Sequence, residues 1–156
     1  MELIIEQFSK CTVRHYELLL EAKPSKSMID LYLPQSHCVE AKDGIRIIGV
    51  IILKLKEPNI LEIVSIAVKE DIRGNGIGSL LIEYALEFAE NYGVNSIEIS
   101  VGSTNFKALY LYQKYGFRMK YIVRDFFTKQ YDQKIMYNNI ELKDLVRLEK
   151  NCVETH

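Results

Sequence analysis

Residues 64–78 read Val-Ser-Ile-Ala-Val-Lys-Glu-Asp-Ile-Arg-Gly-Asn-Gly-Ile-Gly, an apolar run that leads into a polar loop with three glycines, and an amphipathic segment follows directly. The pattern predicts a strand, a tight loop and a helix. Glycines at such a junction let the backbone approach a ligand, and the first helical turn presents N–H groups without partners inside the helix. Because the positive end of the helix dipole lies at the same place, the stretch predicts an anion-binding loop suited to phosphate.

The spacing of the glycines separates this loop from two common phosphate-binding motifs. A P-loop requires a lysine at the start of the helix, and this chain has none there. A dinucleotide fingerprint requires Gly-x-Gly-x-x-Gly, but counting from Gly74 the last position is Ser79. The loop instead contains Arg73-x-x-Gly76-x-Gly78. This resembles the Arg/Gln-x-x-Gly-x-Gly/Ala signature of the GNAT superfamily of N-acetyltransferases, which bind acetyl-coenzyme A.

A second motif follows about 30 residues further along the chain. Residues 105–117 read Asn-Phe-Lys-Ala-Leu-Tyr-Leu-Tyr-Gln-Lys-Tyr-Gly-Phe. This resembles the second GNAT signature, Asn-x-x-Ala-x-x-Leu/Phe-Tyr-x-x-x-Gly-Phe, at every defined position. The two motifs stand in the order and at the distance usual for the family. The resemblance is strong over residues 61–117 and rests on the hydrophobic pattern elsewhere.

Length and composition limit the classes of protein to consider. The chain has 156 residues, of which 48% are hydrophobic and 26% are charged, and its formal net charge is −1. These values are typical of one globular domain, so we expect a single domain over residues 1–156. A near-neutral chain has no basic field to hold nucleic acid, and no run approaches the roughly 18 apolar residues of a membrane span. We therefore expect neither a nucleic-acid partner nor a membrane partner.

The cysteines and histidines predict no metal site and no disulfide framework. There are three of each, and neither set has the spacing of metal ligands. An odd number of cysteines is typical of free thiols in a reducing compartment. The first residues, Met-Glu-Leu-Ile-Ile-Glu, lack the basic region of a signal peptide. We therefore expect a cytoplasmic protein without a bound metal.

Hydrophobic periodicity predicts a mixed α/β (α+β) protein. Alternation predicts strands near 3–8, 37–41, 45–55, 60–68, 97–101, 117–126 and 142–148. Helical spacing predicts helices near 12–22, from Ser25 or Ser27 to before Pro34, from the glycine loop to about 91, and near 105–115. Thr12 is the expected N-cap of the first helix, and Gly93 is expected to end the third. The family resemblance implies the GNAT fold, a mixed central sheet of six to seven strands flanked by about four helices.

The resemblance also implies that acetyl-CoA is the co-substrate, and it indicates which residues hold it. The main chain of Ile66, Ala67 and Val68 would pair with the pantetheine arm. Asn105 would contact the same arm, and an N-cap role in its own helix is an equal alternative. The pyrophosphate would be held by the backbone of the glycine loop, formed by Arg73, Gly74, Asn75, Gly76, Ile77, Gly78 and Ser79.

Transfer of an acetyl group to an amine needs a base and support for the departing thiolate. The run from Glu62 to Val68 resembles the strand that carries the catalytic glutamate in histone acetyltransferases of the superfamily, so Glu62 is the candidate base. An exposed strand glutamate without a catalytic role is the alternative, and Glu98 and Asp125 are weaker candidates. In the family, the tyrosine that matches Tyr112 stands beside the sulfur. A phenol with a pKa of about 10 is a weaker acid than a thiol near 8.5, so we expect Tyr112 to donate a hydrogen bond; simple packing is the alternative.

The identity of the acetyl acceptor is weakly marked in the sequence. The near-neutral charge favours a small-molecule amine or an amino acid over a basic protein tail. Acetylation of protein N-termini or lysines, and a non-catalytic acetyl-CoA-binding module, are the alternatives. The aromatic segment 125–139 is interpreted as a lid over the acceptor, with a surface loop or half of a homodimer interface left open. No cysteine stands in a motif for a covalent intermediate, so direct transfer is expected.

Overall fold

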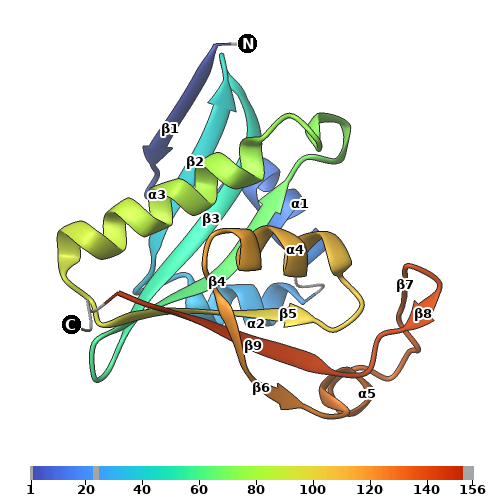
Figure 1. Ribbon diagram of the computed structural model, residues 1–156. Helices are drawn as coiled ribbons and strands as arrows, with labels where there is room; N and C mark the ends of the chain where they lie inside the picture. Colours follow the sequence, from blue (N-terminus) through green and yellow to red (C-terminus); the bar gives the residue numbers. More distant parts are fainter. Residues whose placement is uncertain (1, 23–24, 153–156) are drawn as a thin grey trace. The chain divides into compact units, whose positions relative to one another are not determined.

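The chain divides after Val94 into two compact units, 1–94 and 95–156. The computed structural model describes residues 2–22 and 25–152 (Figure 1). A single domain over residues 1–156 stays a prediction.

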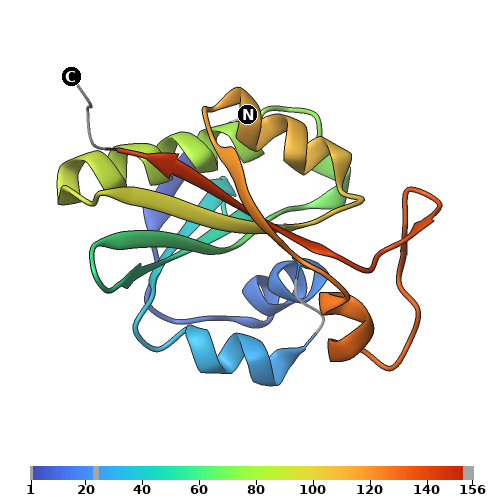
Figure 2. The ribbon, with the colours of Figure 1, turned by 60° about the horizontal axis from the view of Figure 1, so that its bottom comes forward.

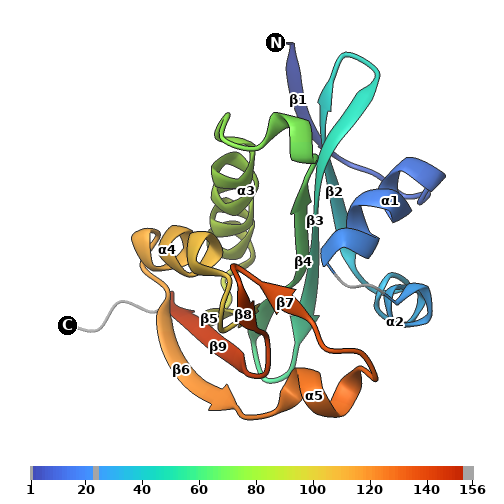
Figure 3. The same cartoon turned by 90° about the vertical axis from the view of Figure 1, so that its right-hand side faces the viewer.

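The first unit is an antiparallel sheet with helices on both faces. The strands stand in the order β1-β2-β3-β4. Figure 3 shows α3 on one face of these strands and α1 and α2 on the other. The elements are β1 (Leu3–Gln7), α1 (Val13–Ala22), α2 (Lys26–Tyr32), β2 (His37–Asp43), β3 (Arg46–Lys56), β4 (Ile60–Val68), a 3₁₀ turn (Glu70–Ile72) and α3 (Ile77–Tyr92).

The two-sided cover explains the burial pattern of β3. Residues 48–53 are all buried, as expected for a strand with apolar packing on both faces. Val50 and Ile52 belong to the core that also contains Leu18, Leu19 and Ile29 of α1 and α2. On β4, by contrast, buried and half-buried residues alternate along the whole strand. The middle of the sheet is thus fixed by burial of apolar side chains, the dominant favourable contribution to folding.

Gly49 lets the first turn of α3 lie close to the sheet. A Cβ atom at this position would stand 3.2 Å from the side chain of Ile77 and 3.2 Å from that of Leu81, both on α3. That spacing is tighter than an ordinary van der Waals contact, so a side chain here would push the start of α3 away from the strand. The start of α3 is therefore positioned by a glycine on a different element.

The helix ends of the first unit follow the sequence signals with one difference. The Ser25 hydroxyl accepts a hydrogen bond from the N–H of Met28 and caps α2. Gly93 takes a left-handed conformation (φ 80°) and ends α3, as expected. Thr12 precedes α1, but its N–H donates to Nδ1 of His15 at 2.9 Å, and its hydroxyl lies 2.9 Å from the same nitrogen. The Thr12 hydroxyl therefore contacts a side chain instead of a first-turn N–H.

The second unit is a three-stranded antiparallel sheet in the order β5-β9-β6, with a separate hairpin of β7 and β8. Figures 1 and 2 show α4 along this sheet and the β7–β8 hairpin projecting beyond it. The elements are β5 (Ser96–Gly102), α4 (Phe106–Lys114), β6 (Arg118–Val123), α5 (Phe126–Gln130), β7 (Met136–Tyr137), β8 (Ile140–Glu141) and β9 (Leu145–Asn151).

The structure corrects two predicted boundaries in the second unit. The strand predicted over 117–126 ends at Val123, because Asp125 takes a left-handed conformation (φ 59°) and Phe126 starts α5. The last strand, predicted over 142–148, runs from Leu145 to Asn151. The mixed α/β composition is as expected, and the described residues contain five α-helices, compared with the expected four or so.

Candidate functional site

The loop between β4 and α3 has a backbone that requires glycine. Gly74 has φ 90° and Gly76 has φ 79°, a region that residues with a side chain adopt at a cost. A Cβ atom at either position would meet no atom within 4 Å. The two glycines are therefore needed for the backbone conformation, and the space beside them is open.

The start of α3 lacks a side-chain cap among the described residues. The N-cap position is Gly76, and the first intrahelical hydrogen bond runs from the N–H of Leu80 to its carbonyl at 3.1 Å. The N–H groups of Ile77, Gly78 and Ser79 precede that bond. The nearest amide side chain, that of Asn75, donates to the carbonyl of Ile72 instead. A helix of 16 residues thus points its positive end and three backbone donors at the open side of the loop.

Arg73 anchors the loop through its guanidinium group. Its Nε donates to the carbonyl of Val68 at 3.1 Å, and its terminal nitrogen lies 3.1 Å from the carboxylate of Glu21 at the end of α1. Both side chains are about half exposed, so the ion pair contributes less than about 1 kcal/mol. The charge of Arg73 is neutralised by Glu21. The main effect of the Arg73 side chain is therefore to connect the loop to β4 and α1.

The strand before the loop brings its main chain up to the glycines. Ile66, Ala67 and Val68 pair with 49–51 on β3, and the N–H of Lys69 donates to the carbonyl of Ile48 at 2.8 Å. Ala67 is buried, whereas the side chains on either side of it are half-buried. The end of β4 is therefore a rigid support for the loop.

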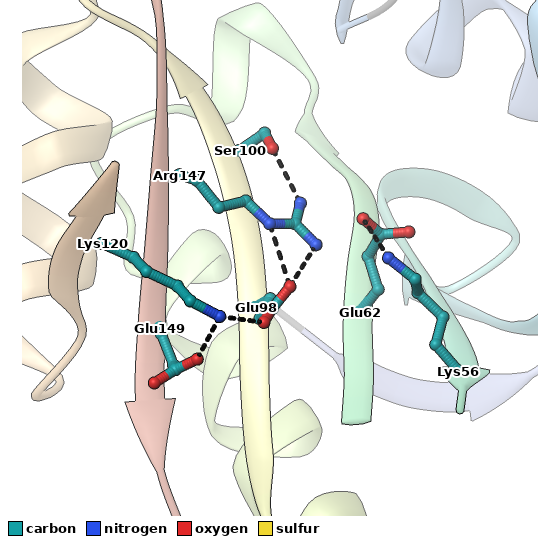
Figure 4. A network of polar contacts seen from close by, with 7 residues as sticks. All are labelled: Lys56, Glu62, Glu98, Ser100, Lys120, Arg147 and Glu149. Carbon is teal, nitrogen blue, oxygen red and sulfur yellow. Dashed lines mark hydrogen bonds and ion pairs between the residues drawn. The ribbon is translucent and has the colours of Figure 1, made fainter. Parts of the chain in front are cut away.

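Glu62 lies nearer the start of β4. It pairs in register with Lys54, and its carboxylate lies 3.8 Å from the Lys56 ammonium group (Figure 4). The Glu62 side chain is 22% exposed. Water therefore reaches this carboxylate, and a cation stands beside it.

The residues that define the second motif form the two ends of α4. The side chain of Asn105 accepts a hydrogen bond from the N–H of Ala108 at 3.2 Å, so the expected N-cap role is confirmed. Gly116 (φ 95°) donates its N–H to Gln113, and the next residue, Phe117, donates to the carbonyl of Tyr112. These two bonds are the Schellman arrangement that closes a helix at a left-handed glycine. The motif thus fixes both ends of α4.

Tyr112 is held in place by this helix end. Its side chain is 5% exposed, and its ring lies 6.1 Å from that of Phe117. Burial raises the pKa of the phenol far above its usual range, because the phenolate is poorly solvated there. The hydroxyl of Tyr112 therefore keeps its proton across the physiological range.

Glu98 is the centre of a charged network on β5, β6 and β9 (Figure 4). Arg147 donates two hydrogen bonds to one carboxylate oxygen, at 3.1 and 2.7 Å, and a third to Ser100. The ammonium group of Lys120 lies 3.0 Å from the other carboxylate oxygen of Glu98 and 2.9 Å from the carboxylate of Glu149. Burial alone would raise the pKa of Glu98, but hydrogen bonds from the two cations outweigh it and the pKa is lowered. This carboxylate is a poor proton acceptor.

Asp125 also fits a catalytic role poorly. The prediction placed it on a strand, but it lies beyond the end of β6 as an exposed residue. Its N–H donates to the carboxylate of Asp144 at 2.8 Å. Its position is that of a residue that turns the chain into α5.

Sequence reasoning missed three residues that support the site. Gly49 was visible as an isolated glycine inside an apolar run, a signal of close backbone approach. Lys150 donates to the carbonyl of Tyr115 at the end of α4, and Asn138 donates to the carbonyl of Thr104 before α4. The last two contacts join residues 35 and 34 positions apart, so no local pattern predicts them.

The described residues contain neither a helix that could span a membrane nor a metal-binding group of side chains. No helix in residues 2–22 or 25–152 combines the length and apolar character that crossing a bilayer requires. In the same part of the chain, no three His, Cys, Asp or Glu side chains are grouped so that they could hold a metal ion.

Comparison with known proteins identifies similar chains. Residues 2–117 match the acetyltransferase (GNAT) family. An uncharacterized N-acetyltransferase of Bacillus subtilis, YvbK, is 44% identical over 133 residues, which cover 85% of this chain and 86% of that protein.

Two solved structures are similar over nearly the whole chain. An acetyltransferase of Bacillus subtilis in complex with CoA has a TM-score of 0.93 and 40% identity, with 97% of this chain and 99% of that chain covered. A GNAT family acetyltransferase from Elizabethkingia anophelis with acetyl-CoA bound has a TM-score of 0.90 and 36% identity, with 96% and 98% covered. The expected fold class is therefore confirmed.

The Glu98 network predicts a large effect of a single charge change. Glu98→Gln removes the negative charge that accepts two hydrogen bonds from the buried Arg147 guanidinium and pairs with Lys120, and we expect the free energy of unfolding at pH 7 to fall by about 3 kcal/mol. Glu149→Gln is the matched control, because Lys120 still pairs with Glu98, and it is expected to lose less than about 1 kcal/mol. Urea unfolding measures both. Equal losses in the two variants would contradict the assignment of Glu98 as the centre.

The same network predicts a pH dependence. Because the pKa of Glu98 is lowered in the folded state, the network stabilises the protein above the unfolded pKa of about 4.5, and the stabilisation is lost as pH falls through the folded value. The urea midpoint of the wild type is expected to fall over this acid range more steeply than that of Glu98→Gln. Parallel pH profiles of the wild type and Glu98→Gln would argue against a stabilising role of the Glu98 charge.

Proposed function

The chain belongs to the GNAT family of acetyltransferases, and we propose that it transfers the acetyl group of acetyl-CoA directly to the amine of a small molecule or an amino acid. That it is an acetyl-CoA-dependent N-acetyltransferase follows from the family and from its relatives. The observation that supports the proposed binding of acetyl-CoA is the uncapped start of α3 beside Gly74 and Gly76, which fits a phosphate group.

We assign the binding of the CoA pyrophosphate to the backbone of the glycine loop. The N–H groups of Ile77, Gly78 and Ser79 precede the first intrahelical bond and need acceptors. Each hydrogen bond to a charged oxygen contributes about 1.5–3 kcal/mol. Because Arg73 is engaged with Val68 and Glu21, its part is to hold the loop in shape. Gly74, Asn75 and Gly76 complete the loop that faces the phosphate.

The pantetheine arm is assigned to the main chain of Ile66, Ala67 and Val68 and to Asn105. The oxygen of the Asn105 amide already accepts the cap bond from Ala108, which leaves its NH₂ group to donate. One side chain can therefore cap α4 and contact the co-substrate at the same time. The two roles that the sequence left open are compatible.

Glu62 is assigned as the group that receives the proton of the amine. An amine with a pKa of about 10.4 is almost fully charged at pH 7, and neutralising it costs roughly 4–5 kcal/mol. The carboxylate of Glu62 is partly exposed, so the proton reaches it directly or through a water molecule. Glu98 is held by two cations, which leaves Glu62 as the better candidate.

Tyr112 is assigned to the departing thiolate. Its buried phenol keeps its proton, because burial raises its pKa, and it therefore donates a hydrogen bond without giving the proton away. Acetyl-CoA supplies the thioester that the amine attacks. No cysteine is assigned a covalent role, so the transfer takes place in one complex of enzyme, thioester and amine.

The loop assignment predicts different effects of two similar substitutions. Gly76 and Gly93 stand at opposite ends of α3 with φ 79° and 80°, and a Cβ at either would meet no atom within 4 Å. Alanine at either position adds the same backbone strain, about 1 kcal/mol. Gly76→Ala is expected to weaken CoA binding at least about tenfold, because it shifts the N–H donors. Gly93→Ala leaves binding near the wild type in titration calorimetry. Equal affinities would remove the loop from the binding site.

The Tyr112 assignment predicts a loss of turnover without a loss of affinity. Tyr112→Phe is expected to lower kcat at least about tenfold, because the thiolate loses its hydrogen-bond donor, while the affinity for acetyl-CoA stays near that of the wild type. Tyr110→Phe on the exposed face of the same helix is the control and is expected to have no effect. Unchanged turnover in Tyr112→Phe would exclude the tyrosine from the mechanism.

The acceptor class is tested by release of CoA thiol from acetyl-CoA in the presence of candidate amines. The panel contains amino acids, polyamines, aminoglycosides and other small amines beside peptides with free N-termini and lysines. Release with a small amine is the expected result. Release with peptides alone would contradict the proposed class, and binding of acetyl-CoA without release in any case would point to a non-catalytic module.

A further inference from the structure

The loop that precedes α4 is held from outside by the segment that follows β6. The N–H of Ser103 donates to the carbonyl of Asp144 at 2.9 Å, and the side-chain amide of Asn138 donates to the carbonyl of Thr104 at 2.8 Å. The side chain of Leu142 packs directly against Gly102. A Cβ atom on Gly102 would stand only 2.9 Å from a methyl carbon of Leu142. Three residues of one segment thus enclose loop 102–104.

Asn138 reaches this loop from the turn of the β7–β8 hairpin. Tyr137 pairs with Ile140, so Asn138 and Asn139 are the two turn residues, and both are left-handed with φ 56° and 61°. A two-residue turn with two left-handed positions suits asparagine and follows the twist of the strands. The turn aims the Asn138 amide at the start of α4, whereas the Asn139 side chain makes no hydrogen bond to the part of the chain that the structure describes.

The carbonyl that Asn138 binds belongs to the residue directly before the N-cap. Thr104 is 5% exposed, and Asn105 donates its N–H to the carbonyl of Gly102 at 3.0 Å. Loop 102–105 is therefore a tight turn whose direction decides where the Asn105 side chain points. The Thr104 carbonyl accepts a hydrogen bond from the N–H of Phe106 at 3.1 Å, and the Asn138 amide is a second donor that further restricts the rotation of this peptide.

We propose that Asn138 is a positioning residue for acetyl-CoA binding: it fixes loop 102–104, and so places Asn105 and the helix that carries Tyr112. The proposal rests on the function assigned above to the start of α4. Without the Asn138 hydrogen bond the loop occupies other conformations, and acetyl-CoA must restore the competent one when it binds. The apparent dissociation constant then rises by the inverse of the competent fraction, while the number of binding sites stays the same.

Asn138→Asp is the test, with Asn139→Asp as the matched control. Aspartate keeps the size of the side chain and tolerates the left-handed conformation, but its carboxylate cannot donate to the Thr104 carbonyl. Calorimetric titration with acetyl-CoA is expected to give a dissociation constant about five- to tenfold higher for Asn138→Asp, the size of one lost hydrogen bond, and within about twofold of the wild type for Asn139→Asp. A merely structural role would lower the stoichiometry instead. Equal constants for the two variants would overturn the proposal.

A second variant and a second readout separate this proposal from the assigned role of Asn105. Asn138→Gly keeps the turn and removes the amide, and amide hydrogen exchange of Ser103 and of the first turn of α4 is expected to speed up in both Asn138 variants. If Asn105→Ala binds acetyl-CoA like the wild type, the role of Asn105 fails, while faster exchange still supports the contact. If exchange is unchanged in the Asn138 variants, the positioning role is refuted, whatever the affinity of Asn105→Ala for acetyl-CoA.

Discussion

The role proposed for the first unit depends on the backbone N–H groups at the start of α3. A helix of 16 residues begins at a glycine without a side-chain cap, so its first donors must find acceptors outside the helix. Two left-handed glycines open the space beside them, and Gly49 lets the first turn lie close to β3. Arg73 ties the loop to the strand and to α1. These donors are held in one direction by the sheet, by the glycines of the loop and by the ion pair of Arg73.

The two sequence motifs use helix ends in opposite ways. In the first motif, Gly76 leaves the start of α3 without a side-chain cap, an arrangement that suits a charged ligand. In the second, Asn105 and Gly116 close both ends of α4 with hydrogen bonds from the chain itself. The closed helix carries Tyr112 in its last turn, where the Phe117 N–H binds its carbonyl. In the proposed site, one motif supplies donors to the ligand, and the other supplies a rigid support for a single side chain.

Much of the fold was predicted from local sequence patterns, because strand alternation and helix-ending glycines depend on neighbouring residues alone. The limits of β4, residues 60–68, were read from alternation, and Gly93 was read as the end of α3. The segment after β6 was not predictable in this way, because aromatic and apolar residues continue past Val123 while Asp125 turns the chain into α5. The contacts of Asn138 and Lys150 join distant parts of the chain, so only the folded structure shows them. The glycines and the arginine of the loop before α3 were visible in the sequence, whereas the distant residues that hold the two ends of α4 were not.

The response of the glycine amides to CoA shows whether the glycine loop holds the pyrophosphate. The chain has eight glycines, so selective ¹⁵N-glycine labelling gives a nuclear magnetic resonance spectrum of few signals. If the loop holds the pyrophosphate, titration with CoA shifts the amide signals of Gly74, Gly76 and Gly78, while that of Gly44, in the β2–β3 turn, stays in place. If CoA binds and the three loop signals do not move, the pyrophosphate is held elsewhere.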